Sequence, residues 1–275
     1  KGYLKNLLPL RKKIKNGNYD ILHAHNGESI LLSFLCFKKN KFFISFMGDD
    51  LLGSLNNNFR YTLKSRVFSL IYKIIAKYFA DGVIVKSMKM QNRLFKGTRS
   101  LIIPNGVDTN LFYPVKVKEN KNEKIILVAY NPNRIVKNYK LLDEAIKYLN
   151  DDSIKIKIIY NDSQKKLMLN YNRCDVLVLT SLHEGSPNII KEAMACNCPI
   201  VSTNVGDVEW VLGNTDGCYI SSFDFRDVAK KVNLALKFSK LNSKTKGRKR
   251  IFDLELDLDS IAKKILFNYK KAICS

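Results

Sequence analysis

The sequence has 275 residues, of which 46% are hydrophobic and 11% aromatic, so we expect two packed domains rather than a disordered chain or a small disulfide-stapled scaffold. Lys and Arg outnumber Asp and Glu by 47 to 25, which suggests an anionic partner, although an AT-rich genome would also enrich lysine. Nucleic acid is not the expected partner, because the sequence lacks zinc-finger, RNA-stacking and basic recognition-helix motifs. Apolar runs fall short of the roughly 18 to 20 residues of a membrane-spanning helix, and the basic residues 1–16 lack the apolar core of a signal peptide.

Short apolar runs alternate with helical periodicity along the chain, a pattern typical of parallel α/β architecture. The first series of strands is expected at residues 19–24, 41–46, 82–86 and 100–103. A second series is expected at residues 124–129, 154–160, 174–179, 198–202 and 217–220. Residues 114–123 combine a proline with charges and asparagines and have no apolar period, which predicts a linker between a domain of residues 1–113 and a domain of residues 124–256.

Two helices stand out by their apolar stripes. The helix expected over residues 59–80 carries Val67, Leu70, Ile71, Ile74, Ile75, Tyr78 and Phe79, with Lys and Arg beside them. Packing on the sheet is the favoured interpretation of this stripe, and contact with an anionic membrane surface is the alternative. The last helix, residues 257–273, also has an apolar face and is predicted to pack back on the first domain.

The cysteines are scattered through apolar segments, as is typical of buried thiols in a reducing compartment. A cytoplasmic location fits this distribution. Cys196 and Cys198 form one Cys-x-Cys, but a second pair at zinc spacing is missing. We therefore expect neither a metal nor a bound cofactor.

Residues 174–203 follow the order strand, polar loop, helix, strand, and the loop leaves the carboxyl end of a parallel strand, where open α/β sheets bind ligands. Gly185 and Ser186 permit close backbone approach, and Pro187 suits the first helical turn. The free amides from Asn188 and Ile189 onward would face an anion, with the helix dipole behind them. This segment predicts a phosphate site.

Two carboxylates flank this phosphate site. Glu184 precedes the helix and Glu192 lies about one turn inside it, and carboxylates suit sugar hydroxyls. A lone Gly-Ser-Pro would more simply be a turn, with Glu192 on a solvated helix face. The whole segment of residues 174–203 decides between these interpretations.

Residues 174–203 resemble the signature of the retaining glycosyltransferases of family four, the group 1 transferases with the GT-B fold. This signature is Glu-Gly-x-Pro, three residues, Glu-Ala-Met-Ala, and then Pro-x-Val-x-Thr-x-x-Gly-Gly. The sequence departs from this signature at Asp207, where a second Gly is usual. The segment IIPNGVDTNLFYP, residues 102–114, is also similar to the family's passage out of its N-terminal domain. The resemblance implies two Rossmann-like parallel-sheet domains facing a cleft.

The resemblance also implies roles for residues of the second domain. Glu184 would contact the transferred sugar, Glu192 the ribose, and the amides after Gly185 the diphosphate. The family places a basic pair after the first strand of this domain, and Lys137 matches its lysine. Arg134 stands three residues ahead of that lysine, instead of the usual five or so, and would be the second cation at the leaving diphosphate.

In the first half, the resemblance places His25, Asn26 and Gly48 on the acceptor side. Met47 stands where many relatives have His, and the adjacent Asp49 and Asp50 are interpreted as loop residues rather than metal ligands. Family members open with a strand and a Gly-rich loop that the residues before position 19 do not supply, so the N-terminal domain is expected to be incomplete.

The expected function is retaining transfer of a hexose from a UDP- or GDP-sugar to a glycan or a lipid-linked acceptor. The setting would be cell-surface polysaccharide synthesis at the inner face of the cell membrane, with the enzyme peripheral on an anionic surface. Two alternatives stay open. A nucleotide-sugar 2-epimerase shares the architecture but needs acid and base carboxylates in the N-terminal domain, and an inactive nucleotide-sugar-binding fragment would bind the donor without transferring it.

Overall fold

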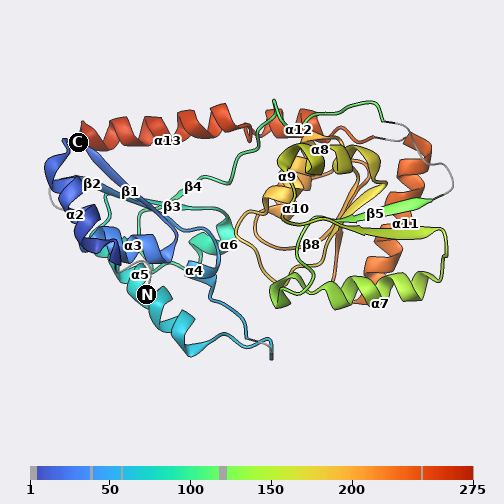
Figure 1. Cartoon of the computed structure of the whole chain (residues 1–275), viewed down its shortest axis with the longest axis horizontal. Helices are drawn as coiled ribbons and strands as arrows, with labels where there is room; N and C mark the ends of the chain where they lie inside the picture. The colour runs from blue at the N-terminus through green and yellow to red at the C-terminus, as the bar shows by residue number, and fades with distance from the viewer. Residues whose placement is uncertain (1–4, 38–39, 57, 118–122, 243, 275) are drawn as a thin grey trace. The chain divides into compact units, whose positions relative to one another are not determined.

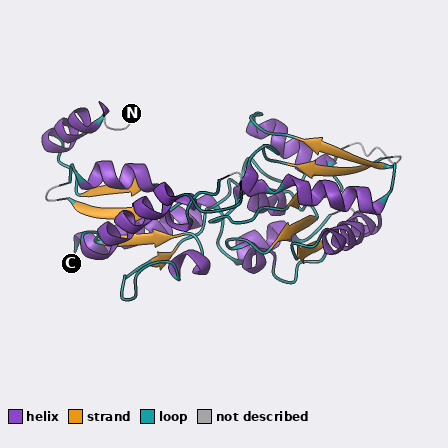
Figure 2. Ribbon diagram, turned by 90° about the horizontal axis from the view of Figure 1, so that it is seen from below, coloured by secondary structure: helices purple, strands orange, loops and turns teal. Residues whose placement is uncertain are grey.

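The computed structural model describes residues 5–37, 40–56, 58–117, 123–242 and 244–274. The chain divides into two compact units, one of residues 1–104 with 262–275 and one of residues 105–261. Each unit contains one parallel sheet with helices packed on it (Figures 1 and 2). The predicted α/β class with two parallel sheets is therefore confirmed.

The first unit has a four-stranded sheet in the order β1-β2-β3-β4. Its elements are α2 (Leu7–Asn16), β1 (Ile21–His25), α3 (Gly27–Phe34), β2 (Lys41–Ser45), α4 (Asp49–Leu52), α5 (Leu63–Tyr78), β3 (Gly82–Val85), α6 (Met88–Gln91) and β4 (Leu101–Ile102). The register pairs His25 with Ser45, so the ends of β1 and β2 lie side by side.

The two faces of β2 separate the layers of the first unit. Phe42 and Ile44 belong to a buried cluster with residues of α3 and α5, including Tyr72 and Ile75. Phe43, which points to the opposite face, meets the ring of Tyr269 in α13 (Leu258–Ile273) with 5.0 Å between ring centroids. Figure 1 shows α13 along one side of this sheet and α3 and α5 along the other.

The second unit has a five-stranded sheet in the order β6-β5-β7-β8-β9. Its elements are β5 (Lys124–Val128), η1 (Ile135–Lys137), α7 (Tyr139–Leu149), β6 (Ile154–Ile158), α8 (Gln164–Arg173), β7 (Val176–Leu179), α9 (Asn188–Ala195), β8 (Ile200–Thr203), α10 (Val208–Leu212), β9 (Cys218–Ser221), α11 (Phe225–Asn242) and α12 (Gly247–Asp253). All four residues of β7 are buried, as is usual for a parallel strand covered on both faces. The neighbouring strands β5 and β7 end at the same edge of the sheet.

The division between the units falls earlier in the chain than the predicted linker at residues 114–123. Residues after Pro104 bond to the second unit: Val107 bridges to Asp257, and the Val115 amide donates to Oδ1 of Asn172 at 2.8 Å. Residues 118–122 of the predicted linker lie outside the described residues.

Helix α5 begins at Leu63 instead of residue 59. Leu55 and Tyr61 form an antiparallel bridge ahead of it, and Thr62 caps the helix by accepting from the Ser65 amide at 3.2 Å. Its predicted apolar stripe does not pack as one face on the sheet, which corrects the favoured interpretation. Ser69, Tyr72, Ile75 and Ala76 form its buried side, while Val67, Leu70, Ile74 and Tyr78 are 41 to 67% exposed.

Candidate active site

A lysine and a glutamate meet at the carboxyl edge of the second sheet. Lys137 ends η1, which follows β5, and Glu184 follows β7. Because β5 and β7 are neighbours, Nζ of Lys137 lies 2.6 Å from Oε1 of Glu184, and the two side chains are only 12% and 19% exposed. The contact is an ion pair held at a ligand-binding edge of an open α/β sheet.

Hydroxyl groups fix both partners of this ion pair. Ser181 donates to the same Oε1 of Glu184 at 2.8 Å, and Thr180 donates to the Lys137 carbonyl at 3.1 Å. The ammonium of Lys137 lies 5.5 Å from the ring centroid of Tyr130, whose pKa burial raises to about 12. With one oxygen of Glu184 occupied by two donors, Oε2 is the atom left to meet a ligand.

Ser186 anchors the loop that carries Glu184. Its Oγ accepts from the Asn105 amide at 3.0 Å and from Lys191 Nζ at 2.7 Å, and it donates to Oδ2 of Asp207 at 2.7 Å. The Asn105 side chain adds bonds to the Ser186 carbonyl at 3.0 Å and to Asn188 Oδ1 at 2.9 Å. The loop that the sequence predicts to bind phosphate is therefore held by polar contacts with Asn105, Lys191 and Asp207.

Backbone packing brings a second loop against this one. Gly206 has φ +57, and a Cβ atom placed there would lie 2.6 Å from the Gly185 carbonyl oxygen. Only glycine fits this close approach without strain. Pro187 then precedes the first residue of α9, Asn188, so the first amides of the helix, Ile189 among them, have no partner within the helix.

Glu192 lies one turn inside α9 and faces a tyrosine of α8. Its Oε2 accepts from the Tyr171 hydroxyl at 2.8 Å. Burial raises the pKa of the Glu192 carboxyl, while this hydrogen bond and the charge of Lys191 lower it. Glu192 is thus an oriented carboxylate, with Oε1 left for a second partner.

The Arg134 carbonyl accepts from the Lys137 amide at 2.8 Å, so the two basic residues of the predicted pair are neighbours through their backbone. The Arg134 side chain is exposed and, among the described residues, makes no hydrogen bond or ion pair. Lys137 reaches Glu184, whereas the side chain of Arg134, the residue just before η1, is exposed.

The predicted acceptor-side residues lie together at the ends of β1 and β2. His25 ends β1, Asn26 caps α3 by accepting from the Ser29 amide at 3.1 Å, and Gly48 precedes α4. Partial burial and the charge of Lys86 lower the pKa of His25. The Gly48 amide donates to Oδ1 of Asp50 at 2.9 Å, so Asp50 orders its own loop.

His23, two residues before His25 in β1, is more enclosed than His25. Its Nε2 lies 2.8 Å from Ser45 Oγ, and its Nδ1 is hydrogen-bonded to the Tyr269 hydroxyl. Burial, followed by the nearby His25 and Lys86, lowers the pKa of His23 to about 3. These contacts assign His23 to the attachment of α13 rather than to chemistry.

Several residues of the second-unit site were not predicted. Ser181, Thr180 and Tyr171 carry no motif of their own, and only the position of Ser181 three residues before Glu184 could have indicated a loop contact. Asn105 lies within the quoted IIPNG segment, but its partner Ser186 is distant in sequence. Among the described residues no group of His, Cys, Asp and Glu could hold a metal ion. In the same part of the chain, no helix is long and apolar enough to cross a bilayer.

Two proteins of known activity resemble the chain over most of its length. An N,N'-diacetylbacillosaminyl-diphospho-undecaprenol alpha-1,3-N-acetylgalactosaminyltransferase of Campylobacter jejuni is 24% identical over 98% of this chain and 82% of its own length. A UDP-Gal:alpha-D-GlcNAc-diphosphoundecaprenol alpha-1,3-galactosyltransferase of Escherichia coli is 24% identical over 80% of this chain and 67% of its own length.

The fold has solved counterparts as well. Sucrose-phosphate synthase from Thermosynechococcus elongatus superposes with a TM-score of 0.82 at 16% identity, covering 99% of this chain and 78% of that one. The two parallel-sheet units thus define the GT-B class of glycosyltransferase. Residues 1–111 match Glycosyltransferase Family 4, and residues 115–237 match Glycosyl transferases group 1. The chain belongs to this family of group 1 glycosyltransferases.

Proposed function

We propose that this chain transfers a sugar from a nucleoside diphosphate to a lipid-linked sugar, with retention of configuration, during polysaccharide assembly. The observation that carries the proposal is the ion pair of Lys137 and Glu184, 2.6 Å apart beside the free amides of α9. A cation, a sugar-binding carboxylate and an anion-binding helix end at one sheet edge suit a donor made of diphosphate and sugar.

In the proposed reaction each residue acts on one part of the donor. The amides at Asn188 and Ile189 bind the diphosphate, and Lys137 stabilises the charge that grows on the leaving phosphate as the C1–O bond breaks. Glu184 uses Oε2 to orient the sugar hydroxyls. Glu192, fixed by Tyr171, accepts a hydrogen bond from the ribose.

Retention is taken from the family resemblance, and Glu184 is assigned a role in binding. Its Oε1 is already bonded to Lys137 and Ser181, which makes the carboxylate a positioned acceptor rather than a nucleophile. In the proposed reaction the acceptor hydroxyl attacks C1 on the face that the phosphate leaves. Its proton passes to the departing phosphate oxygen, so that the new C1–O bond forms as the old one breaks and no metal ion is required.

The choice of substrates rests on the relatives. The names of both transferases specify an acceptor linked to undecaprenol through diphosphate, and one names UDP-Gal as donor. By this likeness we assign a UDP-sugar as donor and a polyprenyl-diphosphate-linked sugar as acceptor.

The charge of the chain supports a place at the membrane. Residues 1–104 with 262–275 contain 23 Lys and Arg against 5 Asp and Glu, whereas residues 105–261 contain 24 against 20. A lysine excess caused by genome composition alone would be spread over both units. Leu63, Val67, Leu70, Ile74 and Tyr78, all exposed, form an apolar strip on α5 with Lys64, Arg66, Lys73 and Lys77 nearby, as on helices that lie in a bilayer interface.

The proposal is tested by transfer of labelled sugar from a panel of UDP- and GDP-hexoses to a polyprenyl-diphosphate-linked N-acetylhexosamine. We expect product from a UDP-sugar, with the anomeric configuration of the donor retained by NMR, and equal yield in the presence of EDTA. Inverted product, or activity that EDTA abolishes and Mn²⁺ restores, would contradict the mechanism. Failure to bind any nucleotide sugar in calorimetry would contradict the site.

A further inference from the structure

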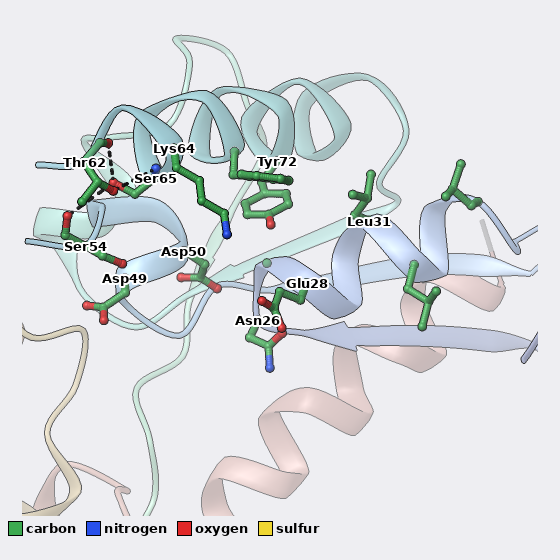
Figure 3. A pocket seen from close by; sticks show the side chains of 14 residues that line it. Asn26, Glu28, Leu31, Asp49, Asp50, Ser54, Thr62, Lys64, Ser65 and Tyr72 are labelled. Carbon is green, nitrogen blue, oxygen red and sulfur yellow. Dashed lines mark hydrogen bonds between the residues drawn. The ribbon is translucent and has the colours of Figure 1, made fainter. Parts of the chain in front are cut away.

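The second unit contains a cavity of about 1140 Å³ that the proposed reaction does not use. It is distinct from the cavity between α3 and α5 in the first unit, which Figure 3 shows. Asn26, which the sequence assigns to the acceptor side, lines that first cavity, so it belongs with the proposed reaction. The residues assigned to the donor site do not line the second-unit cavity either, and this cavity therefore needs a ligand of its own.

The second-unit cavity lies at the amino ends of the strands, opposite the donor site. Lys124 and Ile125 begin β5, Asp175 comes just before β7, and all three line the cavity. Lys137 and Glu184 follow the other ends of the same two strands. At about 3.3 Å per residue, the length of β5 puts roughly 13 Å between the two sites. They are separate sites on one sheet.

The lining of this cavity is strongly basic. Its Lys and Arg residues are Lys116, Lys124, Arg173, Lys237, Lys240 and Lys244. Its acidic residues are Glu123 and Asp175. Since the second unit has 24 Lys and Arg against 20 Asp and Glu, 18 residues of each sign remain outside the cavity. The positive excess of the unit is therefore concentrated in this lining.

Most of these cations lack a counter-ion. Within the described ranges, no hydrogen bond or ion pair is made by the side chains of Lys116, Arg173, Lys237 and Lys240. Lys124, by contrast, lies 2.6 Å from Asp151. Lys237 and Lys240 stand three residues apart on α11, a spacing at which like charges repel each other. An anion bound between these two lysines would remove the repulsion.

Buried polar side chains hold the walls of the cavity together. Asn172 is 2% exposed and accepts from the Val115 amide at 2.8 Å, while its carbonyl accepts from Nζ of Lys244 at 2.8 Å. Asp175 accepts from the Ser239 hydroxyl of α11 at 3.0 Å. An ammonium group has three N–H donors, so Lys244 keeps two for a ligand. The cavity is thus bounded by segments that are bonded to one another.

Helix dipoles account for only part of this charge. Arg173 lies in the last turn of α8 and Lys240 in the last turn of α11, where cations suit the ends of helices. Lys237 lies ahead of that last turn, and Lys116 and Lys244 lie outside the helices. The three lysines therefore need another explanation, and a bound anion supplies one.

A chain of phosphate groups suits this lining. Ammonium groups and the arginine guanidinium bind phosphate oxygens by charge-assisted hydrogen bonds. Two or three linked phosphates carry about three to four negative charges near pH 7, close to the excess of four positive charges in the lining. Pro114, Val115 and Leu236 make part of the wall apolar, so an organic group attached to the phosphates can also be accommodated.

We propose that the second-unit cavity is a further anion site, which binds a chain of two or three phosphate groups through Lys237, Lys240 and Lys244. Arg173 and Lys116 add charge at its rim. Inorganic polyphosphate and a nucleoside triphosphate share this chemistry, and the apolar wall favours the nucleotide. The inference does not depend on the proposed sugar transfer, because the two sites have no residue in common.

The test uses the whole chain and two probes, inorganic tripolyphosphate and ATP, in calorimetry at about 150 mM salt. Tripolyphosphate should bind, and ATP should bind at least about threefold more tightly, because its nucleoside covers apolar wall. Equal affinities would keep the site and identify inorganic polyphosphate as its ligand. If neither probe binds, the cavity is not an anion site.

A double variant tests the position of the site. Lys237→Gln with Lys240→Gln should weaken tripolyphosphate binding at least about tenfold, because two charge-assisted contacts are lost. Both side chains are exposed and glutamine is a good helix former, so the fold should be unaffected. Lys230→Gln with Lys231→Gln removes the same charge from the same helix outside the cavity and should change binding little. Equal losses in both double variants would overturn the assignment.

Two further measurements separate this cavity from other basic surfaces. Lys137→Ala should leave tripolyphosphate binding unchanged, whereas a loss as large as in the Lys237 and Lys240 double variant would move the phosphates to the donor site. Periodate-oxidised ATP, reduced onto nearby lysines and mapped by mass spectrometry, should label Lys237, Lys240 or Lys244. Labels found mainly on lysines of the first unit would assign the binding to that unit's charge excess and overturn the proposal.

Discussion

Nζ of Lys191 lies 2.8 Å from Oδ2 of Asp207, and these side chains are 0% and 4% exposed. Asp207 is the residue at which the family pattern, with its second Gly, is broken. The structure supplies the reason: a buried ammonium on α9 needs a counter-ion, and the loop after β8 provides one. Burial lowers the pKa of Lys191, and the charge of Asp207 raises it.

Removing one partner of this pair should therefore be costly. Lys191→Met or Asp207→Asn alone should lower the free energy of unfolding by about 3 to 5 kcal/mol, because each leaves an uncompensated charge or carboxyl in the interior. The double variant should recover most of the loss in urea unfolding. Lys249→Met, which breaks an exposed pair with Asp253 in α12, is the control and should cost less than about 1 kcal/mol. Single variants as stable as the parent would contradict the argument.

Lys137→Ala should reduce turnover by more than about tenfold and change donor affinity less, because charge on the leaving phosphate grows only as the bond breaks. Steady-state kinetics with a UDP-sugar, together with calorimetry, separate the two effects. Lys140→Ala, on the exposed face of α7 a few residues away, should behave like the parent. Equal losses in both lysine variants would point to a general charge effect.

Glu184→Ala and Glu192→Ala should each weaken donor use by more than about tenfold and leave the fold intact, since both carboxylates face the site. Tyr171→Phe should have a smaller effect, about fivefold, because it removes one hydrogen bond that orients Glu192. Glu144→Ala in α7 is the control. If calorimetry shows unchanged nucleotide-sugar binding in all three site variants, these residues do not form the donor site.

Acid should destabilise the first unit through His23. Its pKa of about 3 in the folded chain lies below the ordinary histidine pKa of 6.5, so between these values the unfolded chain binds a proton that the folded chain does not. The contribution of His23 to the free energy of unfolding should therefore be fully present above pH 6.5. It should decrease on acidification by at most about 1.4 kcal/mol per pH unit. His23→Gln should flatten this slope in urea unfolding from pH 7 to 5, whereas an unchanged slope would assign it to other groups.

The chain should bind anionic vesicles reversibly, with less binding at higher salt. Replacing Lys73 and Lys77 by Gln should cost about 2 kcal/mol of binding free energy. Leu70→Gln with Ile74→Gln should also reduce recovery in sedimentation, whereas Leu241→Gln, at an 81% exposed position of α11, should not. Equal recovery with neutral and anionic lipid would leave the charge excess without a membrane role.

The sequence predicted most of the strands because they are short apolar runs, as expected for central parallel strands such as β7 that are buried on both faces. The family motif also selected Glu184 and Lys137, and the adjacency of β5 and β7 explains why residues so far apart meet. Pattern alone could not predict that Ser186 lies between Lys191 and Asp207, since their contact depends on how two loops pack. The apolar pattern of α5 also predicted the wrong buried side, because the side that is buried contains Ser69 and Tyr72, which count as polar in a sequence.

Helix α5 has one side in the core and an apolar side in solvent. A scan of substitutions along its sixteen residues should therefore affect stability at one set of positions and vesicle binding at another. Stability should dip at Ser69, Tyr72, Ile75 and Ala76 with the period of the helix. Vesicle recovery should dip at Val67, Leu70, Ile74 and Tyr78, displaced around the helix axis. Such a scan would then distinguish, within a single helix, the residues that stabilise the fold from the residues that bind an anionic membrane surface.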